Sequence, residues 1–213
     1  ELFGGYLHYT RFLSMARRSR NIPLAFRRLA RSMASQLPIG FRGRSYGIDF
    51  GSDFNHEVPG LHRLFQPTEI SSLLSSSYSP FPMADRCLDG VNEPMDLLSR
   101  LTRYDALNYL PDDILVKVDR CSMAAGLELR APFLDHELVE FAFRDVPSCF
   151  KATLSVRKHL LKDLAVRVLP PHFDLQRKQG FSIPLASWLQ QGPFRDLVHD
   201  VLLSSACMFD SKA

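Results

Sequence analysis

The stretch from residue 109 to residue 135, YLPDDILVKVDRCSMAAGLELRAPFLD, has the clearest structural pattern in the chain. Pro111 is followed by Asp112 and Asp113, and this order predicts that a helix begins here. Proline is tolerated in a first helical turn, and acidic residues are favoured at the positive end of the helix dipole. Apolar and small side chains then recur at helical spacing, namely Ile114, Leu115, Val118, Cys121, Ser122 and Ala125.

The rest of the sequence also favours helices. Residues 6–18 have aromatic and aliphatic side chains on one side, and Pro23 can open a second helix that ends near Pro38. Residues 40–60 are expected to be irregular and residues 75–94 to be an exposed connection. There is no convincing β-alternation and no internal repeat, so the chain is predicted to be mostly α-helical. Thr68 is expected to cap a short helix over 69–74, and two more helices are expected over 184–190 and 194–204. Asp135 is expected to cap a helix whose inward residues are Leu138, Val139, Ala142 and Phe143. Ser155 is expected to cap another, whose inward residues are Leu160, Leu161, Leu164, Ala165 and Val168.

The composition is that of a folded globular protein. Of the 213 residues, 46% are hydrophobic and 23% are charged, which excludes a disordered chain, a collagen-like fibre and a coiled coil. No apolar run approaches the roughly 18–20 residues of a membrane-spanning helix, and the N-terminus has no signal-peptide pattern. We therefore expect no membrane partner and a cytoplasmic location.

The positive charge is concentrated in the first quarter of the chain. There are 26 Lys and Arg against 23 Asp and Glu, a net charge of +3. Residues 1–48 contain nine Arg, no Lys and a single acid, Glu1, and so carry +8, which leaves −5 for residues 49–213. An Arg-rich, non-catalytic module that binds nucleic acid is one interpretation. A helical surface of a larger enzyme is favoured, because the arginines alternate with apolar helix residues and no aromatic stacking platform accompanies them.

The four cysteines, Cys87, Cys121, Cys149 and Cys207, are 34, 28 and 58 residues apart. This spacing fits neither a zinc motif nor a redox motif, and four Cys in 213 residues are too few for a disulfide scaffold. We expect reduced, buried thiols. The histidines have no metal-ligand spacing either, so no metal site is expected in this chain.

Charged residues interrupt the apolar background of the stretch 109–135. Such charges must be paired or must face a cleft, because an unpaired charge in an apolar interior is costly. One interpretation is a set of internal ion pairs of Arg120 or Arg130 with Glu128 or Asp135, and the other is a functional cleft. The charges concerned are Lys117, Asp119, Arg120, Glu128, Arg130 and Asp135.

Two further segments have the composition of a ligand site. In residues 176–184, QRKQGFSIP, Lys178 precedes Gly180, and a cation beside flexible backbone can be presented to phosphate oxygens. This segment is not a P-loop, because no glycine precedes the lysine at the required spacing. In residues 1–6, ELFGGY, a glycine pair next to the carboxylate of Glu1 allows a close backbone approach.

Together these three segments resemble the synthetase domain of glutamine-dependent asparagine synthetases. Members of that family carry a DELFGGY segment, of which residues 1–6 show the part from the glutamate onward. They also carry the block YLPDDILVKVDR, found at 109–120, followed by SMA and LExRxPFLD, found at 122–124 and 127–135. A KxGFxxP loop comes next, matched by residues 178–184, and the motifs occur in the same order.

The resemblance implies an α/β fold, Rossmann-like and of the adenine nucleotide α-hydrolase type. Residues 1–213 would be the C-terminal helical portion of that synthetase domain, and its parallel sheet would lie largely upstream. Neither the family's SGGxDS pyrophosphate loop nor the N-terminal nucleophilic Cys of its glutaminase domain occurs here. The chain begins inside a motif, so we expect truncation at both ends, and we expect this fragment alone neither to bind ATP tightly nor to make asparagine.

The resemblance also implies a two-step reaction. ATP, with Mg²⁺, activates the side-chain carboxylate of aspartate as β-aspartyl-AMP and releases pyrophosphate. Ammonia, made from glutamine in a separate N-terminal domain, then attacks to give asparagine. The implied partners are therefore aspartate, ATP and ammonia, and a homodimer is one assembly to consider.

The family pattern assigns roles by position. Lys178 would stabilise the negative charge that develops on the α-phosphate and on the leaving pyrophosphate. Glu128 would lie close to the reaction centre and orient a base or substrate. The residues expected near nucleotide, pyrophosphate or substrate are Glu1, Gly180 and Arg130, and those expected to support neighbouring groups, without contact to reacting atoms, are Asp119, Arg120 and Asp135.

Three alternatives stay open. A related amidotransferase could act on another carboxylate, in a surface polysaccharide or a protein, or could form a β-lactam. The SMA triplet and the segment DHELVEFA at 135–142 favour the asparagine-synthetase branch over the lactam-forming one. The second alternative is the Arg-rich binding module, and the third is a degenerate homologue without activity, against which the presence of Lys178 and Glu128 speaks.

Overall fold

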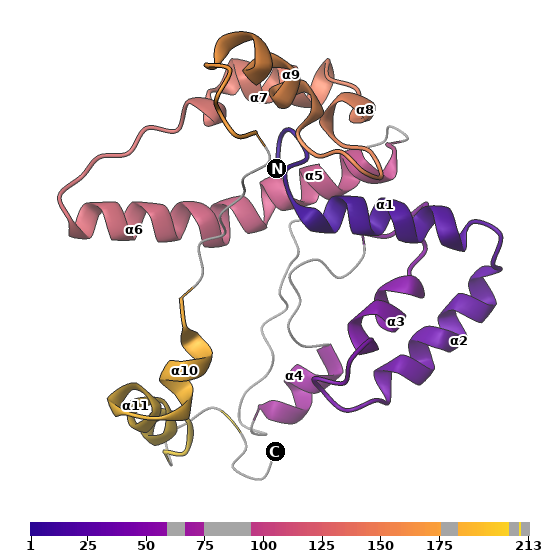
Figure 1. Cartoon of the computed structure of the whole chain (residues 1–213). Helices are drawn as coiled ribbons and strands as arrows, with labels where there is room; N and C mark the ends of the chain where they lie inside the picture. Colours follow the sequence, from indigo (N-terminus) through magenta and orange to yellow (C-terminus); the bar gives the residue numbers. More distant parts are fainter. Residues whose placement is uncertain (59–66, 75–94, 176–182, 205–208, 210–213) are drawn as a thin grey trace. The chain divides into compact units, whose positions relative to one another are not determined.

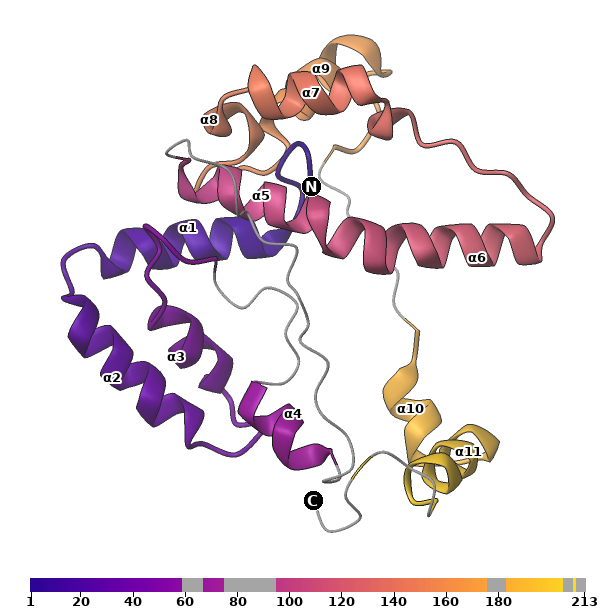
Figure 2. The same cartoon turned by 180° about the vertical axis from the view of Figure 1, so that it is seen from behind.

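The computed structural model describes residues 1–58, 67–74, 95–175, 183–204 and 209. The chain divides into two compact units, residues 1–62 with 85–173 and residues 63–84 with 174–213. Both units are built from helices joined by turns and loops (Figures 1 and 2). Within the described residues the only β-pairings are isolated bridges, which confirms the mostly helical chain expected for a helical portion of an α/β synthetase domain.

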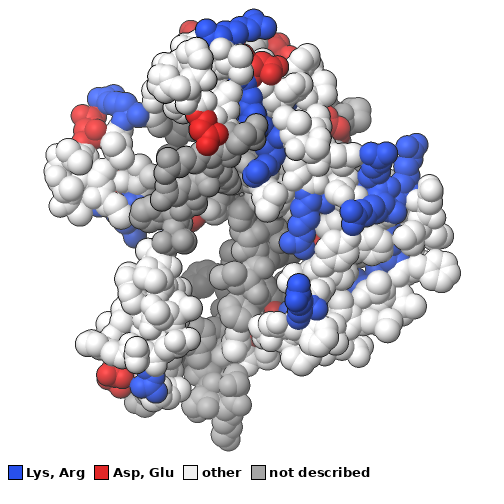
Figure 3. All heavy atoms as spheres, in the orientation of Figure 1, with Lys and Arg blue, Asp and Glu red and all other residues white. Residues whose placement is uncertain are grey.

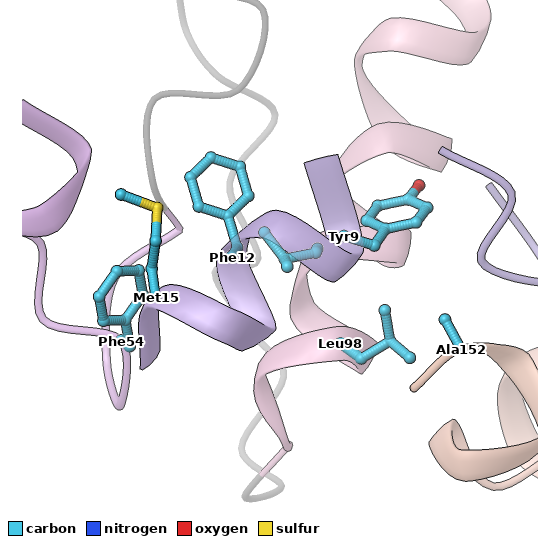
Figure 4. Packing of buried hydrophobic residues seen from close by; sticks show 7 residues of the cluster. Tyr9, Phe12, Met15, Phe54, Leu98 and Ala152 are labelled. Carbon is cyan, nitrogen blue, oxygen red and sulfur yellow. The ribbon is translucent and has the colours of Figure 1, made fainter. Parts of the chain in front are cut away.

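The main core of the first unit lies between α1 (Leu7–Ser19) and α5 (Leu97–Leu107). Tyr9, Phe12 and Met15 recur at helical spacing on α1 and are buried, as the sequence pattern predicts. Leu98 and Leu101 of α5, Phe54 and Ala152 complete the cluster, which Figure 4 shows from close by. This core holds the segment that precedes α1 next to α5.

α5 continues through a π-helical segment, η1 (Leu110–Leu115), into α6 (Val116–Ala124), and the three form one nearly continuous helical rod (Figures 1 and 2). The expectation that a helix begins at Pro111 is therefore wrong. Proline cannot donate a backbone hydrogen bond and its ring clashes with the carbonyl four residues earlier, and the wider π turn accommodates both effects. Asp113, expected at a free helix end, instead lies 3.4 Å from the ammonium of Lys117 one turn later.

α2 (Leu24–Ser35) and α3 (Arg44–Phe50) pack against each other, and α3 contradicts the expectation that residues 40–60 are irregular. The glycines of this region allow the two helices to approach closely, in addition to forming turns. A Cβ at Gly47 would lie 2.7 Å from Cβ of Ala34, and a Cβ at Gly51 would collide with Cβ of Arg31. Glycines that favour a loop by composition therefore mark a helix–helix contact.

Two arginines of the basic segment, residues 1–48, donate hydrogen bonds from their side chains to backbone carbonyl oxygens. Arg27 is buried on α2, and its Nη1 donates to the carbonyl oxygen of Ser52 at 2.7 Å. Arg44, also buried, donates through Nε to the carbonyl oxygen of Leu37 at 2.8 Å. On the face of α1, α2 and α3 drawn in Figure 3, Lys and Arg outnumber Asp and Glu. The basic segment is thus partly structural and partly a charged surface.

A second cluster of the first unit contains residues of η2 (Pro132–Leu134), α7 (His136–Arg144) and α9 (His159–Val168). The short helix α8 (Ser148–Lys151) is in contact with α9. Asp135 caps α7 as predicted, because its Oδ1 accepts hydrogen bonds from the backbone amides of Glu137 (3.0 Å) and Leu138 (3.4 Å). The inward face predicted for α7 is confirmed: Ala142 is fully buried and packs with the N-terminal Leu2 and Phe3.

The predicted cap at Ser155 is wrong. α9 begins at His159, and Ser155 lies in a turn where Thr153 Oγ1 accepts from the backbone amides of Ser155 (3.4 Å) and Val156 (3.1 Å). The threonine two residues earlier therefore organises this turn in place of the expected serine. Of the predicted stripe, Leu160 and Leu161 pack against the second cluster, whereas Leu164 and Val168 are exposed.

The second unit contains α4 (Pro67–Leu73), α10 (Leu185–Gln190) and α11 (Pro193–Leu202). α10 and α11 match the helices expected over 184–190 and 194–204, and Trp188 and Phe194 make an edge contact between them at 5.8 Å. α4 begins at Pro67, which is a favourable first helical residue, so Thr68 lies inside the helix instead of capping it. The expected connection over 75–94 lies outside the described residues.

The two described cysteines, Cys121 and Cys149, are free and exposed, so the expectation of buried thiols is wrong for this pair. Cys121 is on α6, most of whose surface is uncovered. Cys87 and Cys207 lie outside the described residues. None of the described helices has the length and hydropathy that crossing a membrane requires.

Candidate active site

The N-terminal segment ELFGGY makes a tight turn against the stretch that joins α8 to α9. Gly4 has φ +66°, a left-handed conformation that glycine adopts without cost, and a Cβ there would lie 3.0 Å from Cβ of Ala152. A Cβ at Gly5 would lie 2.9 Å from Cε of Lys158. The predicted close backbone approach at the glycine pair is therefore confirmed, and its counterpart is the turn at 151–158.

Tyr6 fixes the carboxylate of Glu1. Its hydroxyl donates to Glu1 Oε1 at 2.5 Å, across the turn that the two glycines form. Burial raises the pKa of Tyr6, and the hydrogen bond to the carboxylate raises it further. The phenol therefore stays protonated and remains a donor, which holds the Glu1 carboxylate in one orientation.

Asp105 of α5 is a fully buried carboxylate that joins α5 to the first turn of α1. The Tyr9 hydroxyl donates to Asp105 Oδ2 at 2.6 Å, and His8 Nε2 lies 2.9 Å from the same oxygen. Burial raises the pKa of Tyr9, and the Asp105 charge adds to this effect. The His8 ring stacks on Tyr6, with centroids 5.2 Å apart, so the Asp105 group and the Glu1–Tyr6 pair are in contact.

Tyr109 connects this cluster to the rod. Its ring meets the edge of Tyr6 at 5.7 Å. Burial, followed by the neighbouring Asp113 carboxylate, raises the pKa of Tyr109. One further turn along, Lys117 lies 3.4 Å from Asp113. The first residues of the chain and the YLPDD motif, about 100 residues apart in sequence, thus form one polar and aromatic site.

The other predicted residues of the stretch 109–135 make no hydrogen bond or ion pair with this cluster in the described part of the chain. Arg130 Nη2 and Glu128 Oε1 are 2.6 Å apart, so one of the expected ion pairs forms, but both side chains are largely exposed, at 83% and 72%. The pair is therefore not internal. Asp119 and Arg120 are exposed on α6, and Asp135 caps α7 and does not pair with an arginine in the described part of the chain.

The residues that the sequence places on the KxGF loop, Lys178 and Gly180, lie outside the described residues. Their proximity to Glu1 or Glu128 therefore stays a prediction. No hydrogen bond or ion pair within the described ranges joins Glu1 to Glu128.

Sequence reasoning missed several members of the site. Asp105 had a detectable signal, because it follows Leu98 and Leu101 at helical spacing and an acid in an apolar stripe must be bonded. His8 and Tyr9 had no such signal in the sequence, since Asp105, to which both bind, is 97 and 96 residues away. Lys158 was also missed, because its place over Gly5 depends on the turn between α8 and α9.

The described cluster does not fit the Mg²⁺ that the resemblance implies. Asp105 and Glu1 already accept hydrogen bonds from tyrosine hydroxyls, and Asp105 is also in contact with His8. Among the described residues no group of three or more His, Cys, Asp or Glu side chains could hold a metal ion. The cluster can instead present one oriented carboxylate, that of Glu1, to a hydrogen-bond donor or a cationic group.

Comparisons with known proteins agree with the motif order. The family model for asparagine synthase matches residues 1–212. A Mycobacterium bovis protein named "Putative asparagine synthetase (glutamine-hydrolyzing)" is 31% identical over 207 residues, which is 96% of this chain and 31% of the relative. "Asparagine synthetase (glutamine-hydrolyzing) 1" of Bacillus subtilis is 29% identical over 192 residues, 89% of this chain and 30% of the relative.

The chain thus spans about a third of the length of the curated relatives it matches. No solved structure matches it significantly. The family is ATP-dependent and its named relatives are glutamine-hydrolysing enzymes. With the family model covering nearly every residue and the ELFGGY and YLPDD segments meeting in one site, the chain belongs to the asparagine synthase family.

Proposed function

We propose that this chain is part of an ATP-dependent enzyme that amidates the side-chain carboxylate of aspartate with ammonia derived from glutamine. The match of the family model over residues 1–212 carries this proposal, and the names of the relatives support it. Residues 1–213 are the C-terminal helical portion of the synthetase domain. A glutaminase domain and the pyrophosphate loop belong to the rest of the protein.

The reaction has two balanced steps. A carboxylate oxygen of aspartate attacks the α-phosphorus of ATP, and the bond from that phosphorus to the pyrophosphate oxygen breaks. Ammonia then attacks the carbonyl carbon of β-aspartyl-AMP, AMP leaves with the electrons of the carbon–oxygen bond, and the nitrogen loses a proton. Negative charge accumulates in the first step, so a fixed cation lowers its barrier.

Lys178 is the cation proposed for that step, and Glu128 is proposed to orient a base or the substrate. Glu128 and its partner Arg130 are exposed on the segment that leaves α6, where a further part of the protein can reach them. Arg130, Glu1 and Gly180 are proposed to lie near nucleotide or substrate. Asp119, Arg120 and Asp135 are proposed to hold neighbouring groups, and the cap that Asp135 provides for α7 supports that role.

The isolated chain is proposed to be inactive. The apolar side chains Met123, Leu127 and Leu129, which belong to family motifs or lie beside them, are about 60% exposed. The exposure of these motif residues supports the proposal that another part of the protein covers them, and that this part is the nucleotide-binding sheet. Aspartate-dependent ATP–pyrophosphate exchange by the 213-residue chain alone would contradict this proposal.

The test uses the full-length protein and the substitution Lys178→Ala. We expect loss of aspartate-dependent pyrophosphate release by at least about 100-fold, because a cation at a developing charge contributes on the order of 3 kcal/mol. Glutaminase activity should persist. Arg195→Ala, at an exposed cation of α11, is the matched control and should leave both activities unchanged.

Two results would contradict the proposal. Normal pyrophosphate release in the Lys178→Ala protein would show that the role given to Lys178 is wrong. A wild-type protein that releases pyrophosphate with another carboxylate but not with aspartate would replace the proposed acceptor. The same assay, run with a panel of carboxylates, separates the two.

A further inference from the structure

Lys158 has an unusual backbone conformation. Among the described residues it is the only non-glycine residue with positive φ, at +54°, directly before α9. A side chain with a Cβ is disfavoured in this left-handed region, where glycine and asparagine are the ordinary residues. A lysine is therefore found where the backbone alone would favour another residue.

The side chain of Lys158 crosses the glycine pair of the ELFGGY turn. A Cβ at Gly5 would lie 2.9 Å from Cε of Lys158 and 3.7 Å from its Cγ, so the lysine side chain passes closely over this glycine. The end of the Lys158 side chain therefore lies over Gly5, the residue before Tyr6, whose hydroxyl holds the Glu1 carboxylate.

No carboxylate of the described residues is within ion-pair distance of Lys158, and its side chain is exposed. The neighbouring Lys151 differs in its burial. It is 1% exposed, its Nζ lies 4.8 Å from the centroid of the Phe143 ring, and burial lowers its pKa. Lys151 is thus packed into the fold, whereas Lys158 presents its charge beside the candidate site.

We propose that Lys158 binds an anionic oxygen group of the substrate, either a phosphate of the nucleotide or a carboxylate of the amino acid, beside the Glu1–Tyr6 pair. This inference rests on the proposed function. A lysine ammonium is a compact point charge with three donors, which suits either group. The glycine pair then has two roles, since it forms the turn and leaves the path that the lysine follows.

Two substitutions separate the effect of the Lys158 charge from the effect of its backbone conformation. In the full-length protein, Lys158→Asn removes the charge and retains a residue that tolerates positive φ, and Lys158→Arg retains a charge. Lys162→Gln, one turn along α9, is the matched control for the loss of one cation. The KM for ATP and the KM for aspartate are measured in ATP–pyrophosphate exchange, together with the Tm of each variant.

We expect Lys158→Asn to raise one KM at least tenfold with no loss of Tm, Lys158→Arg to restore part of it, and Lys162→Gln to match the wild type. A rise confined to ATP identifies the ligand as phosphate, and a rise confined to aspartate identifies it as carboxylate. If a folded Lys158→Asn protein keeps both KM values, the inference is wrong.

Failure of the proposed function gives a different result. A wild-type protein without aspartate-dependent exchange would contradict the function and leave Lys158 to a direct binding measurement. For that case, calorimetric titration with inorganic pyrophosphate and with aspartate compares the wild type and Lys158→Asn. Equal affinity of the two proteins for both ligands, or no binding to either protein, would overturn the inference.

Discussion

At the scale of single residues, the site is a set of polar groups held by aromatic neighbours. Tyr6 orients Glu1, and Asp105 joins α5 to His8 and Tyr9 at the start of α1. A buried carboxylate is costly unless its oxygens accept hydrogen bonds, which both tyrosines supply. The orientation of Glu1 therefore depends on Tyr6, which in turn stacks on the His8 ring bound to Asp105.

Asp49 gives the first unit a pH-dependent stability. Burial raises the pKa of Asp49 to about 6, although Arg11 Nη2 lies 2.9 Å from its carboxylate. Because the folded-state pKa is higher than the ordinary value of 3.8, the stabilisation from protonated Asp49 is complete below about pH 4 and is lost as the pH rises through 6. The shift of about 2 units corresponds to about 3 kcal/mol.

We expect Asp49→Asn to remove this pH dependence. Urea unfolding measured between pH 4 and pH 7 should show a wild-type stability that falls relative to the variant by up to about 3 kcal/mol. Asp145→Asn, at an exposed carboxylate on α7's C-terminal end, is the control and should follow the wild-type profile. Parallel wild-type and Asp49→Asn profiles would show that burial of Asp49 has no effect on its titration.

At the scale of secondary-structure elements, close packing of α2 and α3 depends on glycine. Gly51→Ala places a methyl group against Cβ of Arg31 and 2.9 Å from the carbonyl oxygen of Arg27. Backbone cannot yield as a flexible side chain does, so the helices must separate. We expect a loss of about 1–3 kcal/mol in the free energy of unfolding, measured by urea denaturation.

Ser45→Ala on α3 is the matched control, because Ser45 is exposed and alanine favours a helix. It should change the stability by less than about 0.5 kcal/mol. An equally stable Gly51→Ala protein would show that α2 and α3 can separate without cost, contrary to the packing described.

Local patterns predicted the elements whose signals lie within a few residues. The helix at α1, the Asp135 cap and the close approach at Gly4 and Gly5 follow from spacing or from short motifs, and the structure confirms them. Predictions failed where the local structure depends on contacts with residues that are distant in the sequence. Composition alone cannot show that Gly47 and Gly51 meet another helix, nor that Pro111 lies within a longer helical run.

Those residues of the site that belong to family motifs could be predicted from the sequence. Glu1 belongs to one, and its neighbourhood follows from the glycine pair. The contacts of Asp105 and Lys158 were not predictable, because each depends on how distant segments meet. Lys178 and Gly180 stay predictions, since they lie outside the described residues.

At the scale of the whole molecule, the family motifs of α6 and the segment after it carry several exposed apolar side chains. Met123, Leu127, Leu129 and Phe133 are 53–60% exposed. Soluble proteins seldom leave such groups together in water unless another surface covers them. We expect the isolated 213-residue chain to self-associate through these residues.

The double substitution Leu127→Glu with Leu129→Glu should reduce that association, measured as the weight-average mass in sedimentation velocity at increasing concentration. The control is Leu164→Glu with Val168→Glu on α9, at residues that are 55% and 71% exposed. It should leave the association unchanged. If both double variants, or neither, lower the mass, the association does not depend on the α6 surface.

The helical rod of α5, η1 and α6 has a mechanical consequence. Its first part is held to α1 by the hydrogen bond from Tyr9 to Asp105, near Glu1. Its far end leads into the motif that includes Glu128. With a rise of about 1.5 Å per residue, the far end lies about 30 Å beyond Asp105, so a tilt of about 5° would displace it by about 2–3 Å. A small tilt at the Asp105 group would thus become a larger displacement of the motif residues at the far end of the rod.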